Sequence, residues 1–455
     1  MSDLRNADTA VAASTPMRLR GTRVAAGLLV TLAVCLQEPA RAFSYDAGHY
    51  WGGATAVLGG GSVFEQGLLT VRGVLTSFLY LPSAAVAQVL GERAAGPAVL
   101  LQNALLIAVV GTVLLPAVVA VWRPVTPVVV WVCAAAGALL LAGLAPFPLT
   151  DLWAAALLLA AVVALDGRGW LRLALAGLAA GLAFHLRPAA LIPVAALVVA
   201  VAVARRLSVL WFLGGTAVAL LPQFLLNRWR GTTWLPWPEA TGALTEVQAS
   251  YASFVVRYDT VMSGQVSDPR LFFCSPGMAR ALDGDVPGST GELAKAFLSH
   301  FPQALVLSVQ KVGAALHWPL SMPYYDPAPG ADGLFAVLVT GIAVLGAVAV
   351  LRAAVRRGRR ALSLAQVGVL LVLAGSLLTL TTSATETRFA LPLVLVGIAG
   401  CALLGTERPD RPVPRADRLW LAGAVVAAVA VFGAGVWGLG HPVEGDVTAA
   451  RCSTS

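Results

Sequence analysis

Long apolar segments recur along almost the whole of this chain, and they constrain its fold more than any other feature. Each is long enough to cross about 30 Å of hydrocarbon as a helix. Hydrophobic residues make up 58% of the 455 positions and charged residues only 12%, and the mean hydropathy is +0.80. We therefore predict an all-α polytopic membrane protein with about 11 transmembrane helices. The expected spans are residues 24–38, 97–121, 126–147, 152–166, 173–186, 189–204, 208–226, 333–351, 362–382, 389–404 and 419–440.

The basic residues indicate which side of the membrane each loop occupies. With a cytoplasmic N-terminus, 18 of the 31 lysines and arginines fall on short cytoplasmic loops, as the positive-inside rule requires. Topology thus explains the net charge of +8, and a nucleic-acid-binding surface is not expected. Only two of the basic residues are lysines, which with the richness in Ala, Gly and Val suggests a GC-rich bacterial genome. The expected location is a bacterial plasma membrane.

Two expected extracytoplasmic loops, residues 39–96 and 227–332, are too long to be simple connectors. Both contain apolar residues at helical spacing, around Pro82 in the first and over residues 293–312 in the second. Such stretches are typical of helices that lie in the membrane interface. The expected organisation is a cytoplasmic tail (1–23), a transmembrane catalytic core (24–226) that includes the first loop, the large loop (227–332), C-terminal transmembrane helices (333–440) and an extracytoplasmic tail (441–455).

The first candidate site residues lie in SYDAGHYWGGA, residues 44–54, directly after the first span. Asp46, His49 and Tyr50 stand at positions i, i+3 and i+4, so a helix that begins here places them on one face. A carboxylate in this setting can act as a general base on an acceptor hydroxyl, with the aromatic rings forming a wall for a sugar. The alternative is that Asp46 only caps the N-terminus of an interfacial helix.

Other ionisable residues stand at the ends of three later spans, on the same expected face as Asp46. A charged side chain near the bilayer is energetically costly, so its presence there indicates a function. Asp151, in PFPLTDLW, either caps a helix or joins Asp46 in polarising an acceptor or holding a divalent cation. Arg187, in AFHLRPAALIP, either binds a donor phosphate through two hydrogen bonds or extends to a lipid phosphate. Glu386 and Arg388, in TSATETRFALPLVLV, form an internal pair, contact the donor phosphate, or do both.

These motifs, in their order along residues 25–405, resemble those of GT-C-type membrane glycosyltransferases, specifically the bacterial relatives of protein mannosyltransferases and lipid A aminoarabinose transferases. The segments that carry the resemblance are the region of Asp46, LTD at 149–151, GLAAGLAFHLRPAALIP at 177–193, ALLPQFLLNRWRGTTWLP at 219–236 and ETRFALPLVLV at 386–396. Members of that family take a sugar from a polyprenyl-phosphate carrier on the outer face of the membrane. The resemblance therefore implies a multi-pass enzyme with an extracytoplasmic active site.

The resemblance also assigns roles to residues. It implies that Asp46 is the catalytic carboxylate and Asp151 the acidic residue at the head of a later span. Arg187 and Arg388 match basic positions for the donor phosphate, and an Asn/Arg pair that opens the large loop is matched by Asn227 and Arg228. Many members have Asp-Glu in the first loop, whereas an alanine follows Asp46 here, which leaves this aspartate as the single candidate base.

We therefore expect an inverting transfer from a polyprenyl-phosphate sugar, the donor substrate, to an acceptor hydroxyl. In that reaction Asp46 takes the hydroxyl proton, and the arginines stabilise the charge that builds on the leaving phosphate. A Mg or Mn ion between Asp46 and Asp151, with His49 and a phosphate completing its shell, is left open. The expected partners are membrane lipids, the lipid-linked donor, and an acceptor that is a glycan, lipid, protein or metabolite.

Two other classes of function remain open at this point. A transporter or flippase of a lipid-linked or small-molecule substrate predicts ionisable or helix-breaking residues near the middle of several spans. A structural subunit with a decayed site is the third class. The charged candidates stand at span ends instead, which favours the enzyme.

The large loop and the tail give two further expectations. The loop aromatics indicate either a carbohydrate-binding surface or an interfacial belt; they are Trp234, Trp237, Tyr251, Tyr258, Tyr324 and Tyr325. Cys274 and Cys452 both fall on the expected outside, where disulfides persist, so a bridge between loop and tail is an open expectation.

Overall fold

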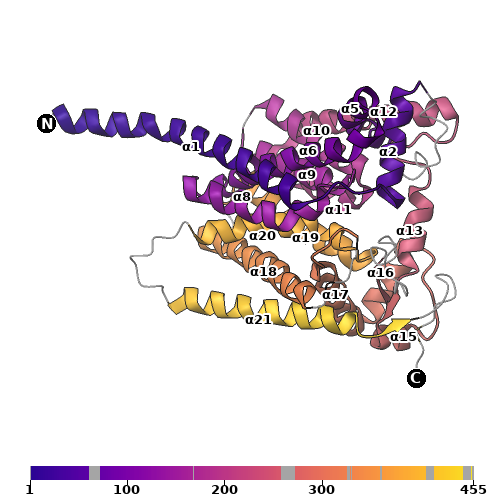
Figure 1. Ribbon diagram of the computed structural model, residues 1–455. Coiled ribbons are helices and arrows are strands. Elements are labelled where there is room, and N and C mark those ends of the chain that lie inside the picture. The colour runs from indigo at the N-terminus through magenta and orange to yellow at the C-terminus, as the bar shows by residue number, and fades with distance from the viewer. Residues whose placement is uncertain are drawn as a thin grey trace.

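The computed structural model confirms an all-α polytopic membrane architecture in which most long helices lie side by side in one bundle (Figure 1). It describes residues 2–60, 72–167, 169–257, 272–324, 328, 330–358, 361–405, 415–443 and 452, and for residues 2–17 and 415–416 it describes the helical backbone only. Within these residues, eight helical stretches have the length and composition of membrane spans, and three shorter apolar helices accompany them. One stretch, residues 188–230, contains two consecutive helices, so each of the eleven expected spans corresponds to a helix.

The first half of the chain forms helices up to residue 230. They are α1 (Ser2–Gln37), α2 (Tyr45–Leu58), α4 (Thr76–Leu79), α5 (Leu81–Leu90), η2 (Glu92–Ala94), α6 (Ala95–Val109), η3 (Val110–Leu114), α7 (Leu115–Ala120), α8 (Pro127–Leu141), η4 (Ala142–Leu144), α9 (Asp151–Ala164), α10 (Trp170–Leu186), η5 (Pro188–Ala190), α11 (Leu191–Arg205), η6 (Arg206–Ser208) and α12 (Val209–Arg230).

The second half adds the large loop and the last spans. Its elements are α13 (Thr241–Ala249), β1 (Phe254–Val256), β2 (Phe272–Cys274), α15 (Pro276–Leu282), α16 (Thr290–Ser299), α17 (Phe301–Leu316), α18 (Ala331–Arg357), α19 (Leu364–Thr382), η8 (Thr387–Ala390), α20 (Leu391–Leu404), α21 (Arg415–Gly438) and β3 (Pro442–Val443).

Local sequence determines where several of these helices begin and end. Ser363 and Gln366 form a reciprocal capping box that satisfies backbone groups at the start of α19. α12 ends at Gly231, which adopts a left-handed conformation with φ of +69°. In the first loop, Pro82 stands in the first turn of α5, where its missing N–H costs nothing, so the expected helix around it is divided into α4 and α5.

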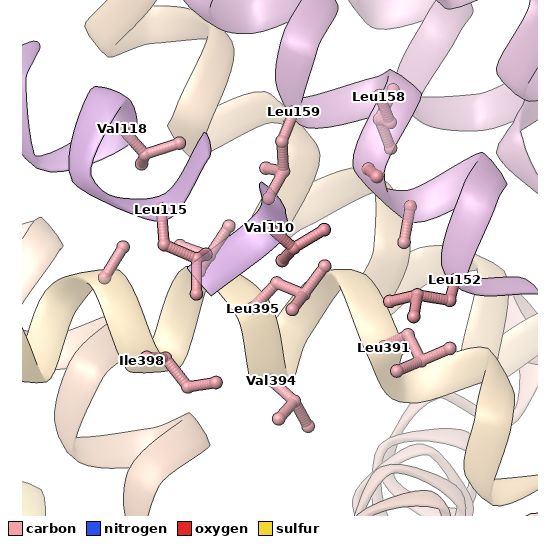
Figure 2. Packing of buried hydrophobic residues seen from close by; sticks show 14 of the residues in the cluster. Val110, Leu115, Val118, Leu152, Leu158, Leu159, Leu391, Val394, Leu395 and Ile398 are labelled. Atoms are coloured by element: carbon pink, nitrogen blue, oxygen red, sulfur yellow. The ribbon is translucent and has the colours of Figure 1, made fainter. Parts of the chain in front are cut away.

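α20 is the central helix of the bundle. Its apolar side chains, among them Leu391, Leu395 and Ile398, pack against α7, α9 and the π-helical turn η3 (Figure 2). Because α20 continues directly from η8, this packing fixes the position of the Glu386–Arg388 segment at the end of the bundle.

Small residues allow pairs of helices to approach closely, among them the glycines of the Gly177/Gly181 spacing. A Cβ atom on Gly177 of α10 would lie only 1.9 Å from the Phe212 carbonyl oxygen of α12. Gly346 of α18 meets α20 in the same way, since its Cβ would lie 1.9 Å from the Gly397 carbonyl oxygen. This is the packing that small residues provide in membrane proteins.

The large loop forms a small unit beside one end of the bundle. The apolar stripe expected over 293–312 belongs to two helices, α16 and α17, because the chain turns at His300 and Pro302 stands in the first turn of α17. A three-stranded antiparallel sheet, in the order β1-β2-β3, joins this loop to the chain after α21. A disulfide between Cys274 and Cys452 makes the same connection, so the expected bridge is confirmed.

The last helix, α21, packs little of its surface against the rest of the protein. Only 11% of its most apolar 18-residue stretch is buried. At its first turn Asp417 forms an ion pair with Arg352 of α18 at 2.8 Å and also contacts Arg356. At its other end β3 follows within a few residues. α21 is therefore fixed at both ends.

Candidate functional site

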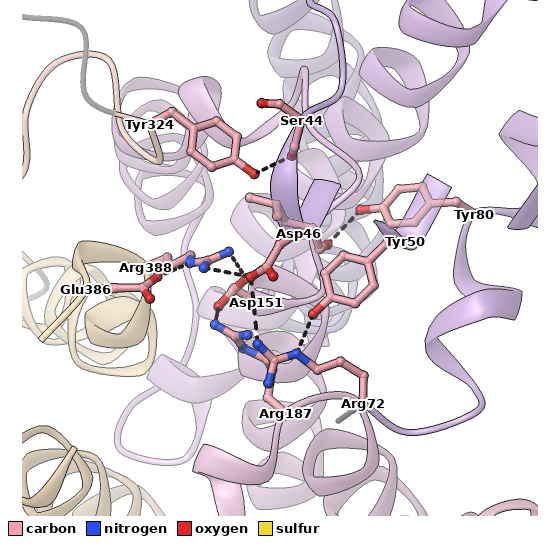
Figure 3. Close-up of polar contacts among 11 residues, drawn as sticks. Ser44, Asp46, Tyr50, Arg72, Tyr80, Asp151, Arg187, Tyr324, Glu386 and Arg388 are labelled. Atoms are coloured by element: carbon pink, nitrogen blue, oxygen red, sulfur yellow. Dashed lines mark hydrogen bonds and ion pairs between the residues drawn. The ribbon is translucent and has the colours of Figure 1, made fainter. Parts of the chain in front are cut away.

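Six charged side chains from five separate parts of the chain converge at one end of the bundle (Figure 3). We call them the charged cluster: Asp46, Arg72, Asp151, Arg187, Glu386 and Arg388. Five of the six are candidates from the sequence, and the structure brings them together across as many as 342 positions of chain.

Asp46 is placed by the start of α2. Ser44 has an extended backbone and begins the helix without a side-chain cap, so Asp46 does not itself serve as the N-cap. Tyr45, between them, adopts a left-handed φ of +47°, a conformation that costs a non-glycine residue about 1–3 kcal/mol and that is enriched at active sites.

Arg388 lies at the centre of the charged cluster. Its Nη2 atom donates to Asp46 Oδ2 at 2.8 Å, its Nη1 atom lies 3.8 Å from Asp151 Oδ2, and its Nε atom contacts Glu386. The internal Glu386–Arg388 pair expected from the sequence is thus confirmed, together with contacts to two further carboxylates. One guanidinium links all three acids.

The other two arginines complete the ring of charge. Arg187, the C-cap of α10, contacts Asp151 Oδ1, and Arg72 Nη2 lies 3.8 Å from Asp46 Oδ2. Arg72 Nε also donates to the Tyr50 hydroxyl at 3.0 Å. Three guanidiniums therefore face three carboxylates, and their formal charges balance.

Burial divides the cluster into an inner and an outer part. The side chains of Arg388 and Asp151 are 2% and 3% exposed, whereas those of Asp46 and Arg72 are 16% and 19% exposed. The ion pairs of Asp46 with Arg72 and Arg388 both use Oδ2, so Oδ1 lies outside these two contacts. Asp46 is thus the carboxylate that a molecule arriving from outside the bundle meets first.

Several buried polar atoms of the inner part have no hydrogen bond of good geometry. They are Asp151 Oδ2, Arg187 Nη2, Arg388 Nη1 and the Thr150 hydroxyl. The three charged atoms are nevertheless held in ion pairs, Arg187 Nη2 with Asp151 Oδ1 and Arg388 Nη1 with Asp151 Oδ2. Two of the three charged atoms are guanidinium nitrogens, which suit an anion.

The neighbouring arginines set the protonation of the outer carboxylate. Burial by itself raises the pKa of Asp46, but Arg388, Arg72 and Arg187 outweigh it and lower that pKa to about 2. For Glu386 the balance is reversed, because burial raises its pKa despite the opposing effect of Arg388. Asp46 is therefore ionised at neutral pH. Glu386 takes up a proton more readily than Asp46 does.

Hydrogen bonds from its own backbone to two buried side chains hold the segment that carries Arg72. The Leu75 backbone N–H donates to His185 Nε2 at 3.2 Å, and the Val74 backbone N–H donates to Gln223 Oε1 at 2.9 Å. This segment belongs to the first loop, and these bonds attach it to α10 and α12.

A second network positions the loop before Asp151. Asn103 of α6 donates from its amide to two carbonyl groups, those of Ala145 and Phe147, at 3.1 and 2.9 Å. The Tyr80 hydroxyl lies 2.7 Å from the Leu149 carbonyl oxygen and 3.0 Å from Asn103 Oδ1. These bonds determine where α9 begins, and Asp151 is its first residue.

An apolar groove reaches the inner part of the cluster. Asp151, Arg187 and Arg388 form its polar end, and side chains of α9, α11, α19 and α20 form the rest. The Arg187 guanidinium lies over the Phe389 ring at 4.8 Å, which holds it at this junction. With a volume of about 50 Å³ the groove is narrow. The guanidinium groups of Arg187 and Arg388 thus stand at one end of a mostly apolar groove.

Three candidates from the sequence lie outside the cluster. His49 is exposed on α2. Asn227 is turned inward, where it accepts from Gln223 and donates to the carbonyl oxygens of Leu235 and Trp237. Arg228 lies over the Trp234 ring at 3.5 Å.

Sequence reasoning missed Arg72 and Tyr80, and it assigned Tyr324 only to a general aromatic surface. A signal for Arg72 was present, because it is an arginine on an expected outer loop, as Arg187 is. Tyr324 packs edge-on against Phe147 at 4.6 Å and covers the start of α2 (Figure 3). Of the other loop aromatics, Tyr251 is buried beside the sheet, and Tyr258 and Tyr325 lie outside the described residues.

The arrangement does not suit the divalent cation left open by the sequence. The Arg388 guanidinium stands between Asp46 and Asp151, where a bridging ion would lie. Among the described residues, no group of three or more His, Cys, Asp or Glu side chains is arranged to hold a metal. Guanidinium groups supply the positive charge here.

Comparison with known proteins gives one likeness of fold. No family model matches the sequence, and no curated protein matches it. A solved structure of the archaeal oligosaccharyltransferase AglB from Archaeoglobus fulgidus, in complex with an inhibitory peptide and a dolichol-phosphate, aligns with a TM-score of 0.47 and 13% identity. The alignment covers 94% of this chain and 56% of that one, so the chain spans little more than half the length of AglB.

Proposed function

We propose that the protein is an integral membrane glycosyltransferase of GT-C type, which transfers a sugar from a polyprenyl-phosphate donor to an acceptor hydroxyl. The observation that carries this proposal is the meeting of the apolar groove with the guanidiniums of Arg187 and Arg388. A polyprenyl-phosphate sugar has a hydrocarbon chain joined to an anion, and the site presents the matching surfaces in the same order. The narrow groove holds the carrier segment nearest the phosphate, and the remaining chain lies in the bilayer.

In this proposal the carboxylate and the arginines have separate roles. Asp46 Oδ1, which is outside the ion pairs with Arg72 and Arg388, accepts the proton of the acceptor hydroxyl as the oxygen attacks the anomeric carbon. The bond from that carbon to the phosphate oxygen breaks, and Arg187 and Arg388 stabilise the negative charge on the departing polyprenyl phosphate. A single displacement inverts the configuration at the anomeric carbon.

The bound phosphate also changes the base. Without donor, Arg388 and Arg72 hold Asp46 as a weak base with a pKa of about 2. A phosphate that takes hydrogen bonds from Arg388 draws this guanidinium away from Asp46 and adds a nearby negative charge, and both effects raise the pKa of the carboxylate. Asp46 thus gains basicity when the donor is in place.

The location of the charges supports an enzyme over a transporter. The cluster lies at helix ends, in the first turns of α2 and α9, at the C-cap of α10 and at the start of η8. We propose that this end is extracytoplasmic and that the membrane is a bacterial plasma membrane, as the distribution of arginines indicates.

The test is transfer in liposomes that contain a panel of polyprenyl-phosphate sugars, with membrane extract as the source of acceptors. Wild-type protein should consume donor and release polyprenyl phosphate, and Asp46→Asn should abolish transfer while Asp285→Asn, at an exposed loop position, should not. Full transfer by Asp46→Asn would remove this residue from the mechanism. Movement of donor across the bilayer without release of polyprenyl phosphate would favour the transporter.

A further inference from the structure

A second cavity lies on the other side of α2 from the charged cluster. It has a volume of about 570 Å³, within the range of small-ligand sites. α2, α5, η2, the start of α6 and the chain before α2 line it, and it is open on one side. We call it the α2–α5 cavity, and the side chains that matter here are Arg41, Phe43, Trp51, Thr55, Gln88 and Glu92.

Two aromatic rings form one wall of this cavity. The centroids of Phe43 and Trp51 are 5.1 Å apart and their planes meet at 56°, so two ring faces form a corner. Both rings are partly exposed. Such a corner offers apolar contact to the C–H face of a pyranose or furanose ring.

Polar groups with complementary hydrogen-bonding capacity line the remainder. Gln88 both donates and accepts, Glu92 accepts, and Arg41 donates. The Thr55 hydroxyl donates to the Trp51 carbonyl oxygen at 3.2 Å, so its lone pairs remain as acceptors. Arg41 and Glu92 carry opposite charges, which favours a neutral ligand with many hydroxyl groups over an anion.

α2 separates this cavity from the reaction centre. Asp46 and Trp51 are five positions apart, which on a helix corresponds to about 7.5 Å along the axis and roughly 140° around it. A ligand in the cavity therefore lies near Asp46 but does not touch it.

We propose that the α2–α5 cavity is a saccharide-binding site that holds a sugar unit of the acceptor remote from the reacting hydroxyl. The role of that sugar as part of the acceptor rests on the proposed glycosyltransferase function, whereas saccharide binding by the cavity does not. Because the site contributes binding and no chemistry, its loss raises KM for the acceptor and leaves kcat unchanged.

Binding is tested by retention of the protein on an array of immobilised pentose and hexose oligosaccharides. The protein is reconstituted in lipid nanodiscs, because alkyl maltoside and glucoside detergents carry sugars that compete. Wild-type protein should bind at least one oligosaccharide, and Trp51→Ala should weaken that binding about tenfold, the effect of losing one good aromatic contact. Trp170→Ala removes a tryptophan that is 58% exposed at the start of α10 and is the matched control.

A second variant guards against misfolding. Glu92 is exposed, so Glu92→Gln removes a charge and keeps the fold, and it should also weaken retention. Absence of retention on every oligosaccharide, or equal retention of all variants, overturns the proposal. Native mass spectrometry gives another result that would overturn it: a phospholipid bound to the wild type and lost in Trp51→Ala, with no oligosaccharide bound to the wild type.

The two proposals fail in different ways. Asp46→Asn should retain oligosaccharide binding because the cavity lies on the other side of α2. Binding without any transfer would refute the proposed function and leave the saccharide site standing. Transfer by Trp51→Ala with an unchanged acceptor KM would refute the acceptor role of the cavity.

Discussion

Replacement of Asp46 by asparagine should destabilise the protein at neutral pH by an amount that the charged cluster determines. The pKa of Asp46 is lowered from 3.8 to about 2, mainly because Arg388 and Arg72 outweigh the effect of burial. At 1.36 kcal/mol for each pKa unit, this corresponds to roughly 2 kcal/mol of stabilisation of the ionised form. With an unfolding entropy of about 2.1 cal/mol/K per residue, a chain of this length should lose about 2 °C in Tm.

The pH dependence of this loss has a definite sign. A carboxylate with a depressed pKa contributes its stabilisation fully above its ordinary pKa near 4, and the contribution disappears as the pH falls toward 2. The Tm difference between wild type and Asp46→Asn should therefore be constant from about pH 8 to pH 5 and fall to about half by pH 3.

Thermal unfolding in nanodiscs, followed by intrinsic fluorescence across this pH range, measures the difference. Asp285→Asn, at an exposed position, is the control and should show a Tm change near zero throughout. Equal Tm values for wild type and Asp46→Asn at pH 7 would contradict the reasoning, and so would a difference that grows as the solution is acidified.

Four further predictions concern the charged cluster, the packing of α10 against α12, and the disulfide. Arg187→Lys should weaken polyprenyl phosphate binding about tenfold, measured by native mass spectrometry, since lysine cannot form the two parallel bonds of a guanidinium. The donor is a monoanion that disturbs the charge balance of the cluster, and burial raises the pKa of Glu386, so donor binding should make Glu386 take up a proton. Calorimetry in buffers of different ionisation enthalpy should detect this uptake. A binding enthalpy that does not depend on the buffer would contradict it. Gly177→Leu should separate α10 from α12 and cost at least about 2 kcal/mol, seen as a loss of monodisperse protein in size-exclusion chromatography. Cys274→Ser should leave the C-terminal tail more sensitive to protease, whereas Cys133→Ser, away from the loop, should not.

Much of the charged cluster could be predicted because topology alone assigns its members to one end of the bundle. Asp46, Asp151, Arg187 and Arg388 each stand where an apolar segment ends, and alternating spans bring those ends to the same side. Where several ionisable residues share one end and must avoid lipid, they meet one another. The same logic located the helices, since span length and apolar content are read directly from sequence.

The parts that could not be predicted depend on which way individual side chains turn. Asn227 stands at the end of a span as Arg187 does, yet its amide is satisfied by Gln223 and by carbonyl groups of the following loop. Likewise, the alternative roles of Glu386 and Asp46 depend on which side chain each one contacts. Asp46 contacts Arg388, which is more than three hundred positions away in the sequence. Spacing along one helix does not contain that information.

The attachment of β3 to the loop sheet has a consequence for biosynthesis. β2 obtains its second neighbour from residues 442–443, which follow the last membrane helix. On the ribosome, the segment 227–332 emerges long before those residues exist, so its sheet stays incomplete until α21 has been inserted and the chain beyond it has reached the side of the membrane that holds the loop. Shortening the protein at its far end should therefore damage a region more than a hundred residues upstream, and the maturation of that region reports that insertion of the last helix has finished.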